Sequence, residues 1–395
     1  MRKINLLIIT NLFPNPAEPN RGIFVAEMVK ELKNRVELTV LSPMPWFPRW
    51  GALKRFKHWN KFSQIPENYE VNGQEVICPK YLAVPKLGFL HSFFLFISLY
   101  SKVKQLHKEK RFNLINVHWI FPDGVAGFWI SRLLKIPIVL TAHGTDVNSY
   151  LNMALRKHQI LAALKGADKI IVVSQSQRNK LIERRIEPIK IEVVQNGFND
   201  IFTIYDKISC RKELNLAINC KTIAFIGRLV QVKGFDFLIK ATQELGNILN
   251  EDYEIAVVGD GSLRKFYETQ VKNAGLSKRI RFYGEKSHSE LCKWFCASDI
   301  ICMPSLSEGC PTVLIEALAC GRPVVASRVG EIPNLIKEYN GILFEPRDVK
   351  QLTDSLYKAL QKKWDADLIR KSVEHMTWRS CADKYLKVYE ELVCA

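Results

Sequence analysis

Residues 222–241 read TIAFIGRLVQVKGFDFLIKA, in which a short apolar run is followed by a turn with two glycines and then by a helical pattern. The run has the length and the β-branched and aromatic content of a buried strand. The same alternation of short strand candidates and longer helical patterns continues along the whole chain of 395 residues. This alternation predicts βαβ units and therefore parallel sheets.

The strand candidates form two groups, which are separated by a looser stretch after the turn dipeptide Asn196-Gly197. The first group comprises residues 4–10, 36–42, 114–118, 136–142, 169–174 and 191–196, and the second comprises residues 222–227, 254–259, 280–284, 299–304 and 323–330. We therefore predict an α/β protein with two doubly wound, Rossmann-like domains, residues 1–198 and 199–376, that face a cleft. Ligands of such sheets bind outside the carboxyl ends of the strands, so the functional site is expected in the turns that follow them.

The composition excludes some classes of protein and leaves others open. With 47% hydrophobic and 25% charged residues, the chain is not disordered, and its net charge of +17 is compatible with nucleic acid, anionic lipid or a phosphorylated small molecule as a partner.

All ten cysteines except Cys78 lie from Cys210 onward in apolar periodic segments, and no Cys-x-x-Cys motif occurs. They are predicted to be core side chains of an intracellular protein rather than disulfides or metal ligands.

Two apolar runs resemble targeting or membrane segments. The run that begins MRKINLLIIT stops at Asn11 without a cleavage site, so a buried strand is expected there instead of a signal peptide. The run at 87–100 is interrupted by His91 and is shorter than a spanning helix, which needs about 17 residues or more. We expect no transmembrane segment.

The turn after residues 222–227 carries Arg228 and Lys233, flanked by glycines. A guanidinium fork and an ammonium group that converge at a strand end suit a diphosphate, although a solvated basic loop is the alternative. The turn is not a P-loop, because no Gly-Lys-Ser/Thr sequence follows at the right spacing. Gly259 and Gly261 form a second glycine pair without a third glycine, and a tight turn suffices to explain it.

The stretch SLSEGCPTVLIEALAC, residues 305–320, places Glu308 before a helix and Glu316 on it, with Pro311 expected at the first helical position. The rise from Pro311 to Glu316 is roughly 7.5 Å. Two carboxylates at this spacing suit the hydroxyls at the two ends of an elongated ligand such as a nucleotide sugar. The N–H groups that would attract its phosphates belong to Gly309, Cys310 and Thr312.

The alternative for this stretch is that Glu308 caps the helix and Glu316 lies on the surface. An acid without a function would be costly inside so apolar a helix, which favours the binding role. Carboxylate pairs also bind divalent cations, but the only Asp-x-Asp motif, Asp365-Ala-Asp367, reads as an exposed helix start. We expect no metal site and no cofactor, since Arg228 and Lys233 can neutralise a diphosphate.

In the N-terminal half, the strand at 136–142 runs into His143, Gly144 and Asp146, and the strand before it ends at His118. A histidine at a strand end can donate to a sugar hydroxyl or transfer a proton, whereas a structural role is the alternative. The long loop after the first strand ends at Arg21-Gly22, where the backbone could approach a phosphate.

Taken together and in this order, these motifs resemble the retaining glycosyltransferases of family 4, which have the GT-B fold. The resemblance covers nearly the whole chain, and the opening TNLFPNPAEPNRGIFVAEMVKEL looks like the bacterial exopolysaccharide and teichuronic-acid branch. The motifs are TAHGTDV (141–147), GRLVQVKG (227–234), VVGDGSL (257–263) and SEGCPTVLIEALACGRPVVASRVGEIPNLI (307–336).

The resemblance implies a retaining, metal-independent hexose transfer from a nucleotide-diphosphate sugar. Arg228 and Lys233 would hold the diphosphate, Glu316 the ribose, and Glu308 with the backbone after it the hexose. His143 would lie beside the sugar and Gly22 against the phosphates once the cleft closes. The helix at 377–395 would cross back to the N-terminal domain. The implied donor-binding residues are Gly22, Arg228, Lys233, Glu308, Gly309, Cys310, Pro311, Thr312 and Glu316, and the implied catalytic residues are His143, Arg228, Lys233 and Glu308. Cys310 is an uncommon residue in this turn.

The same resemblance implies a glycan or lipid-linked acceptor in cell-surface polysaccharide synthesis. Residues 49–62 mix basic and aromatic side chains, and residues 87–111 place an apolar segment before a basic one. Both segments would hold a cytoplasmic protein at the anionic inner face of the membrane, whereas a buried helix with a solvated face is the alternative. A sugar-nucleotide epimerase of the same fold and a basic nucleic-acid-binding protein are the competing functions. The carboxylate spacing argues against the first, and the lack of a nucleic-acid-binding motif argues against the second.

Overall fold

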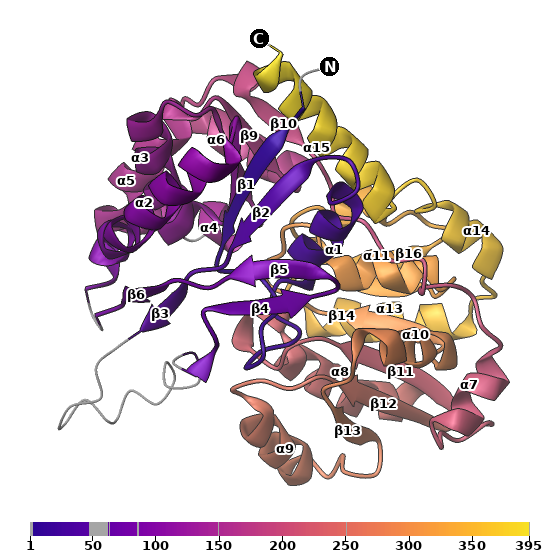
Figure 1. Ribbon diagram of the computed structural model, residues 1–395. Helices are drawn as coiled ribbons and strands as arrows, with labels where there is room; N and C mark the ends of the chain where they lie inside the picture. The colour runs from indigo at the N-terminus through magenta and orange to yellow at the C-terminus, as the bar shows by residue number, and fades with distance from the viewer. Residues whose placement is uncertain are drawn as a thin grey trace. The chain divides into compact units, whose positions relative to one another are not determined.

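The computed structural model describes residues 3–46, 62, 64–84, 87–148, 150–249 and 251–394. The chain divides into two compact units: unit 1 comprises Met1–Gln195 and Trp378–Ala395, and unit 2 comprises Asn196–Thr377. Each unit contains a largely parallel sheet with helices on both faces (Figure 1), which confirms the predicted α/β class with two doubly wound domains. Within the described ranges, no helix is long and apolar enough to cross a membrane.

Unit 1 has an eight-stranded sheet in the order β10-β9-β8-β7-β1-β2-β5-β4, in which only the β4–β5 pair is antiparallel. From β1 the chain continues to β2 on one side and later returns to β7 on the other side. The point between β1 and β7 is therefore the topological switch point of this sheet. The strands are β1 (Asn5–Thr10), β2 (Glu37–Leu41), β4 (Asn68–Val71), β5 (Gln74–Ile77), β7 (Leu114–His118), β8 (Ile138–Ala142), β9 (Lys169–Val172) and β10 (Ile191–Val193).

Alternate residues of β1 point to opposite faces of this sheet, and each face has its own apolar core. Leu7 and Ile9 pack with the helices α2, α3 and α5, whereas Leu6 and Ile8 pack with α1 and α15. The C-terminal helix α15, yellow in Figure 1, is tied to β7 by a hydrogen bond from Tyr389. The helices of unit 1 are α1 (Ile23–Leu32), α2 (His91–Lys110), α3 (Val125–Leu134), α4 (Thr145–Asn148), α5 (Ala154–Gly166), α6 (Gln175–Glu183) and α15 (Trp378–Val393).

Unit 2 has a wholly parallel six-stranded sheet in the order β13-β12-β11-β14-β15-β16. Its strands are β11 (Lys221–Ile226), β12 (Tyr253–Val258), β13 (Ile280–Gly284), β14 (Ile300–Met303), β15 (Val324–Ser327) and β16 (Gly341–Phe344). The chain winds outward from β11 to β13 and then crosses to β14 on the other side of β11. The switch point of this sheet therefore lies between β11 and β14.

Eight helices accompany this sheet among the described residues of unit 2. Their bounds are α7 (Lys207–Glu213), α8 (Phe235–Ile248), α9 (Arg264–Asn273), α10 (His288–Ala297), α11 (Thr312–Ala319), α12 (Ile332–Leu335), α13 (Val349–Gln361) and α14 (Ala366–Lys371). Helices α8 and α13 pack together over one apolar core, and α10 packs against both α7 and α11.

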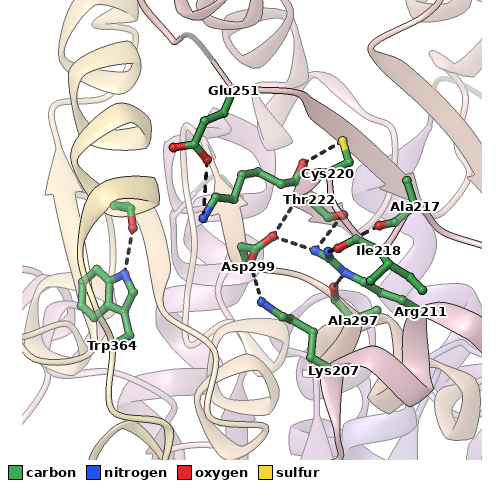
Figure 2. A network of polar contacts seen from close by, with 12 residues as sticks. Lys207, Arg211, Ala217, Ile218, Cys220, Thr222, Glu251, Ala297, Asp299 and Trp364 are labelled. Atoms are coloured by element: carbon green, nitrogen blue, oxygen red, sulfur yellow. Dashed lines mark hydrogen bonds and ion pairs between the residues drawn. The ribbon is translucent and has the colours of Figure 1, made fainter.

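A buried charge network fixes the amino ends of β11 and β14 (Figure 2). The guanidinium of Arg211, which is 3% exposed, pairs with Asp299 at 2.7 Å and donates to the carbonyl of Ala297. Asp299 also pairs with Lys207 and accepts from the backbone N–H of Thr222 at 2.7 Å. Because these contacts lie where the two strands begin, they hold the strand pair together at the end opposite the carboxyl edge.

Five strands fall outside the segments predicted from the sequence. β4 and β5 form a hairpin around Asn72-Gly73, and both turn residues have positive φ. Asn-Gly between two short strands is a strong hairpin signal, so the sequence contained the information for this element. β3 (Met44–Trp46) and β6 (Lys80–Leu82) form a small separate sheet, and β16 is the outer strand of unit 2.

Candidate active site

The loops that follow β11 and β14 meet at the switch point of unit 2. Gly234 has a left-handed φ of 65° at the start of α8, and a Cβ atom there would lie 2.0 Å from the carbonyl oxygen of Pro304. The backbone N–H of Leu306 donates to the carbonyl of Val232 at 2.8 Å. Only glycine permits so close an approach of the two backbones, so Gly234 fixes the geometry of the basic turn.

This backbone contact brings Lys233 and Glu308 together. Lys233 Nζ lies 2.6 Å from Glu308 Oε1, and Ser305 Oγ donates to the same oxygen at 2.7 Å. The side chains of Lys233 and Glu308 are 22% and 10% exposed, so the ion pair is largely shielded from water. Arg228 lies in the same loop with an exposed side chain, and no described residue pairs with its guanidinium.

The turn after Glu308 differs from the prediction by one residue. Pro311 is the N-cap, with a ψ of 116°, and the helix begins at Thr312. Pro311 was expected inside the helix because its fixed φ suits a first helical position, but its extended ψ places it just before the helix. Among the described residues, none accepts a hydrogen bond from the backbone N–H groups of Gly309 and Cys310. These donors are therefore available at the N-terminus of α11, as predicted from the sequence.

Two further contacts hold this turn in place. Asn196 Nδ2 donates to the carbonyl of Cys310 at 3.1 Å, and the backbone N–H of Glu331 donates to the carbonyl of Gly309. Gly330, with a φ of 58°, is approached so closely by the carbonyl of Glu308 that a Cβ atom would lie 2.3 Å from it. The backbone carbonyls of the turn are thus held in place by residues from two other parts of unit 2.

Glu316 is buried on α11 and pairs with a residue that the sequence reasoning missed. His288, the first residue of α10, places its Nε2 atom 3.0 Å from Glu316 Oε1. The exposed fractions are 7% for the Glu316 side chain and 20% for the His288 side chain, which excludes the surface alternative for Glu316. The partner was missed because the two residues are far apart in sequence and belong to different helices.

The second glycine pair of unit 2 is structural, as the sequence suggested. A Cβ atom at Gly259 would lie 2.0 Å from the carbonyl oxygen of Gly227, and one at Gly261 would lie 2.4 Å from that of Leu229. Asp260 pairs with Arg264 at 2.9 Å. In contrast, Gly227 itself has a φ of 152° with no atom within 4 Å of its would-be Cβ, so space remains beside the end of β11.

In unit 1, the structure joins two of the histidines singled out in the sequence. His118 Nδ1 and His143 Nε2 are 3.0 Å apart, and the rings stack with their centroids 5.2 Å apart. Burial lowers the pKa of His143 to about 3 and, with the neighbouring ring, places the pKa of His118 well below its usual range. Both imidazoles are therefore neutral at pH 7 and suit hydrogen bonding better than proton uptake.

Asp146 has a structural role in the same region. Its buried carboxylate accepts hydrogen bonds from the backbone N–H groups of Ile120, His143, Gly144 and Val147. It thereby joins the loops after β7 and β8. Gly22, in contrast, starts α1 with a φ of 61°, and a Cβ atom there would lie 2.3 Å from the carbonyl of Leu12. The fold of its own loop is therefore sufficient to require glycine at this position.

A pocket of about 260 Å³ opens at the switch point of unit 1. Arg156 lies in it with its guanidinium 5.1 Å from the ring centre of Phe121 and 5.3 Å from that of Tyr150. No described residue forms a hydrogen bond or ion pair with this guanidinium. Trp119 has a positive φ of 80°, which is rare for a bulky residue and typical of functional sites. The lining residues are Asn11, Leu12, Arg21, His91, Trp119, Phe121, Pro122, Tyr150 and Arg156.

Asp365 and Asp367 lie at the start of α14, where Asp365 caps the helix by accepting from the N–H groups of Asp367 and Leu368. This is the exposed helix start that was predicted for the Asp-x-Asp motif. The segment 49–62, predicted to contact a membrane, lies outside the described residues except for Phe62.

The family models match both halves of the chain. The description "Glycosyltransferase Family 4" matches residues 22–200, and "Glycosyl transferases group 1" matches residues 206–375. A D-inositol 3-phosphate glycosyltransferase of Mycobacteroides abscessus is 30% identical over 317 residues, which are 73% of this chain and 68% of the relative. TuaC of Bacillus subtilis, named for a role in teichuronic acid biosynthesis, is 28% identical over 94% of this chain and 97% of its own length.

Solved structures share the fold across the full length. Sucrose-phosphate synthase from Thermosynechococcus elongatus superposes with a TM-score of 0.76 at 20% identity and covers 100% of both chains. HepE of Anabaena, solved in complex with UDP, gives a TM-score of 0.73 at 20% identity over 99% of this chain and 100% of its own. The fold and the site define a glycosyltransferase with the GT-B fold. The chain belongs to the family 4 glycosyltransferases and is a transferase enzyme.

Proposed function

We propose that the protein is a retaining, metal-independent hexosyltransferase that uses a nucleotide-diphosphate sugar as donor. The observation that carries the proposal is the shielded ion pair of Lys233 and Glu308 at the switch point of unit 2. The pair places the ammonium group of Lys233, which can bind phosphate, next to the carboxylate of Glu308, which can bind hydroxyl groups. The N-terminus of α11 follows Glu308 closely in the chain. In a nucleotide sugar, the diphosphate likewise lies next to the hydroxyl groups of the sugar.

Each part of the donor then has a partner of suitable chemistry. Arg228, whose guanidinium has no described partner, and Lys233 would neutralise the diphosphate and the charge that develops on it as the glycosidic bond breaks. The open space beside Gly227 and the N–H groups of Gly309 and Cys310 leave room and donors for phosphate oxygens. Of the remaining turn residues, Pro311 is the N-cap and Thr312 the first residue of the helix whose positive end would face the anion.

Glu316 and Glu308 would bind the two ends of the donor. Glu316 would accept hydrogen bonds from the ribose hydroxyls, with His288 holding its carboxylate in place at 3.0 Å. Glu308 would accept from hexose hydroxyls, with Lys233 and Ser305 holding it. Roles for His143 beside the sugar and Gly22 near the phosphates are carried over from the family resemblance and remain predictions.

In a retaining transfer of this kind, the acceptor hydroxyl attacks the anomeric carbon from the side of the leaving diphosphate. The new C–O bond forms as the bond to the phosphate oxygen breaks, and the hydroxyl proton passes to the departing diphosphate. Lys233 and Arg228 stabilise the leaving group in place of a divalent cation. No carboxylate has to act as a nucleophile, which agrees with the engagement of Glu308 by Lys233 and Ser305.

The acceptor would bind in the pocket of unit 1 and carry an acidic group. Arg156 presents guanidinium donors between Phe121 and Tyr150, and no described residue pairs with them. Aromatic faces suit sugar rings, and a guanidinium fork suits a carboxylate or phosphate. The names of two relatives, which refer to teichuronic acid and inositol 3-phosphate, fit such an acceptor. We propose a glycan or lipid-linked acceptor in cell-surface polysaccharide synthesis.

Contact with the inner face of the membrane is part of this proposal. Helix α2 buries Leu95, Leu99 and Val103 in the core, so the helix itself is part of the fold. Its outer side exposes Phe93 and Ile97 by 48% and 55% and continues to basic residues toward its C-terminus. An exposed apolar patch beside lysines suits an anionic bilayer surface.

A panel of nucleotide-diphosphate sugars tests the proposed function. The purified protein is incubated with each donor and with acidic and neutral acceptors, without added Mg²⁺ or Mn²⁺, and the product is examined by NMR. We expect one preferred donor and a product with the donor's anomeric configuration. Inverted product would overturn the retaining mechanism, and a requirement for Mg²⁺ or Mn²⁺ would overturn metal independence.

A further inference from the structure

Three cysteines of unit 2 meet at the interface of α10 and α11. Cys292 and Cys296 are one helical turn apart on α10, and Cys320 directly follows α11. Their side chains are 2%, 0% and 0% exposed, and their sulfur atoms all lie within 4.8 Å of one another. Among the described residues, no other group of three metal-ligating side chains lies so close together.

Three distances around this cluster are close to those of a tetrahedral metal site. The sulfur atoms of Cys292 and Cys320 are 3.6 Å apart, and the carbonyl oxygen of Thr203 lies 3.5 Å from Cys292 Sγ and 3.3 Å from Cys296 Sγ. In a tetrahedral zinc site, with metal–sulfur bonds of about 2.3 Å and metal–oxygen bonds of about 2.0 Å, two sulfurs lie about 3.8 Å apart and a sulfur and an oxygen about 3.5 Å apart. One sulfur–sulfur and two sulfur–oxygen separations are therefore close to those of such a site, and the other sulfur–sulfur separations are within 4.8 Å.

The surroundings of the cluster suit thiolates. The backbone N–H of Tyr205 donates to Cys296 Sγ at 3.4 Å, as backbone groups do around metal-bound sulfur. Arg322 lies near enough for its charge to act on Cys296, and its Nε atom is buried without a hydrogen-bond partner among the described residues. A divalent ion with three thiolates has a net charge of −1, which the Arg322 guanidinium would balance.

We propose that Cys292, Cys296 and Cys320, with the carbonyl oxygen of Thr203, form a structural site for a thiophilic d¹⁰ cation, for which Zn²⁺ has the fitting charge and geometry. Thiolates select such ions over Mg²⁺ or Ca²⁺, and binding releases the thiol protons to solvent. The ion would enter as the chain folds, because the thiols are buried in the folded state. It would be separate from the diphosphate and would not take part in the transfer.

The site would brace the nucleotide end of the donor site, a consequence that rests on the proposed function. Cys292 follows His288 by one helical turn on α10, and Cys320 follows Glu316 by one turn on α11. A metal that joins these cysteines would therefore fix the same helix pair that carries the His288–Glu316 contact. Loss of the metal should weaken nucleotide binding more than it changes the rate of transfer at saturating donor.

Metal content and a cobalt titration test the site without any activity measurement. We expect about one zinc per chain in protein purified without chelator, and sulfur-to-cobalt charge-transfer absorption when the metal-free protein is titrated with Co²⁺. Cys292→Ala and Cys320→Ala should each reduce the absorption at least tenfold. Cys302→Ala should retain it, because Cys302 is an equally buried thiol of β14 in the same unit.

A second measurement covers the case in which the variants do not fold. Zinc release from the wild-type protein is followed during titration with an organomercurial reagent, and release should be complete as these thiols are consumed. Wild-type protein that contains no zinc and gives no cobalt absorption would overturn the proposal. So would equal loss of absorption in Cys302→Ala, or a Cys292–Cys320 disulfide in protein prepared without oxygen.

Discussion

Lys233 and Glu308 lie 75 residues apart in the sequence, yet their charged atoms are 2.6 Å apart at the switch point of unit 2. The close approach of Gly234 to Pro304 sets this distance, because it joins the loops after the two neighbouring strands β11 and β14. The pair is largely buried, so its attraction is stronger than that of a surface pair. The predicted donor site therefore depends mainly on the side chains of Lys233 and Glu308.

Glu316→Gln should weaken donor binding more than it slows transfer. The variant keeps the shape of the side chain but loses the charged acceptor for the ribose hydroxyls and for His288, and hydrogen bonds to charged groups contribute about 1.5–3 kcal/mol. We expect the KM for the donor to rise about tenfold or more with little change in kcat, measured by steady-state kinetics. His288→Gln is the matched variant and should give a smaller rise. A drop in kcat at unchanged KM would contradict the binding role.

The His118–His143 pair should make unit 1 sensitive to acid. The pKa of each ring is lowered in the folded state, so between pH 6.5 and the lowered values the unfolded chain binds more protons than the folded one. The free energy of unfolding should therefore fall as the pH falls below 6.5, by about 2 kcal/mol at pH 5 for His143, and His118 should act in the same direction. The effect is measured by denaturant unfolding at a series of pH values.

His118→Gln should remove part of this acid sensitivity, whereas His158→Gln, at an exposed position of α5, should not. Asp123 acts in the opposite sense: burial raises its pKa to about 7, so its contribution to stability is lost as the pH rises from about 4 to 7. Both histidine variants retain Asp123, so its contribution cancels when the pH dependence of their unfolding free energies is compared. Equal pH dependence of both variants would show that the pair does not control acid stability.

Arg156→Ala should discriminate between acceptors. If Arg156 binds an acidic group, its loss should reduce kcat/KM for an acidic acceptor by about 10–100-fold, corresponding to about 1.5–3 kcal/mol for a charged hydrogen bond, and affect a neutral acceptor much less. Arg156→Lys keeps the charge but not the planar fork. Its kcat/KM for the acidic acceptor should therefore lie between those of the wild type and of Arg156→Ala. An equal loss for acidic and neutral acceptors would mean that Arg156 does not recognise the charge.

Flotation with liposomes tests the membrane contact of α2. Phe93→Ser combined with Ile97→Ser should reduce recovery with anionic liposomes at low salt, because both side chains are exposed on the outer side of the helix. Lys104→Glu combined with Lys108→Glu should reduce it as well and remove its dependence on salt. The control is Leu133→Ser, an exposed apolar residue of α3. Wild-type protein that does not float with anionic liposomes contradicts the proposed contact.

The sequence predicted the parts of the fold that depend on local patterns. β7 was predicted residue for residue, since LINVH is a short β-branched run with clear ends, and α1 begins after Gly22 as expected. The short strands β3, β4, β5 and β6 lack a long apolar run, because at most one residue of each is buried. The turn Asn72-Gly73 was the one local signal for this region.

The residues of the candidate site were singled out from the sequence, whereas their contacts were not, and their roles in donor binding stay predictions. Lys233, Glu308 and Glu316 were recognisable by their positions in turns and on an apolar helix. The partners Ser305 and His288 were not. Ser305 lies three residues before Glu308, and its contact depends on the conformation of the loop after β14. His288 reaches Glu316 only because α10 packs against α11. The three cysteines were predicted as core residues for the same reason: a spacing of four on α10 is typical of a buried helix face, and the third thiol comes from another element.

A double-mutant cycle of Lys233→Ala and Glu308→Gln tests the central claim most directly. Transfer is measured for the wild type, both single variants and the double variant, with the preferred donor. We predict that each single change lowers kcat/KM by about 10²–10³, as expected for groups that stabilise a developing charge, and that the double variant loses far less than the product of the two. Undiminished transfer in both single variants would contradict the assignment of the donor site to this ion pair.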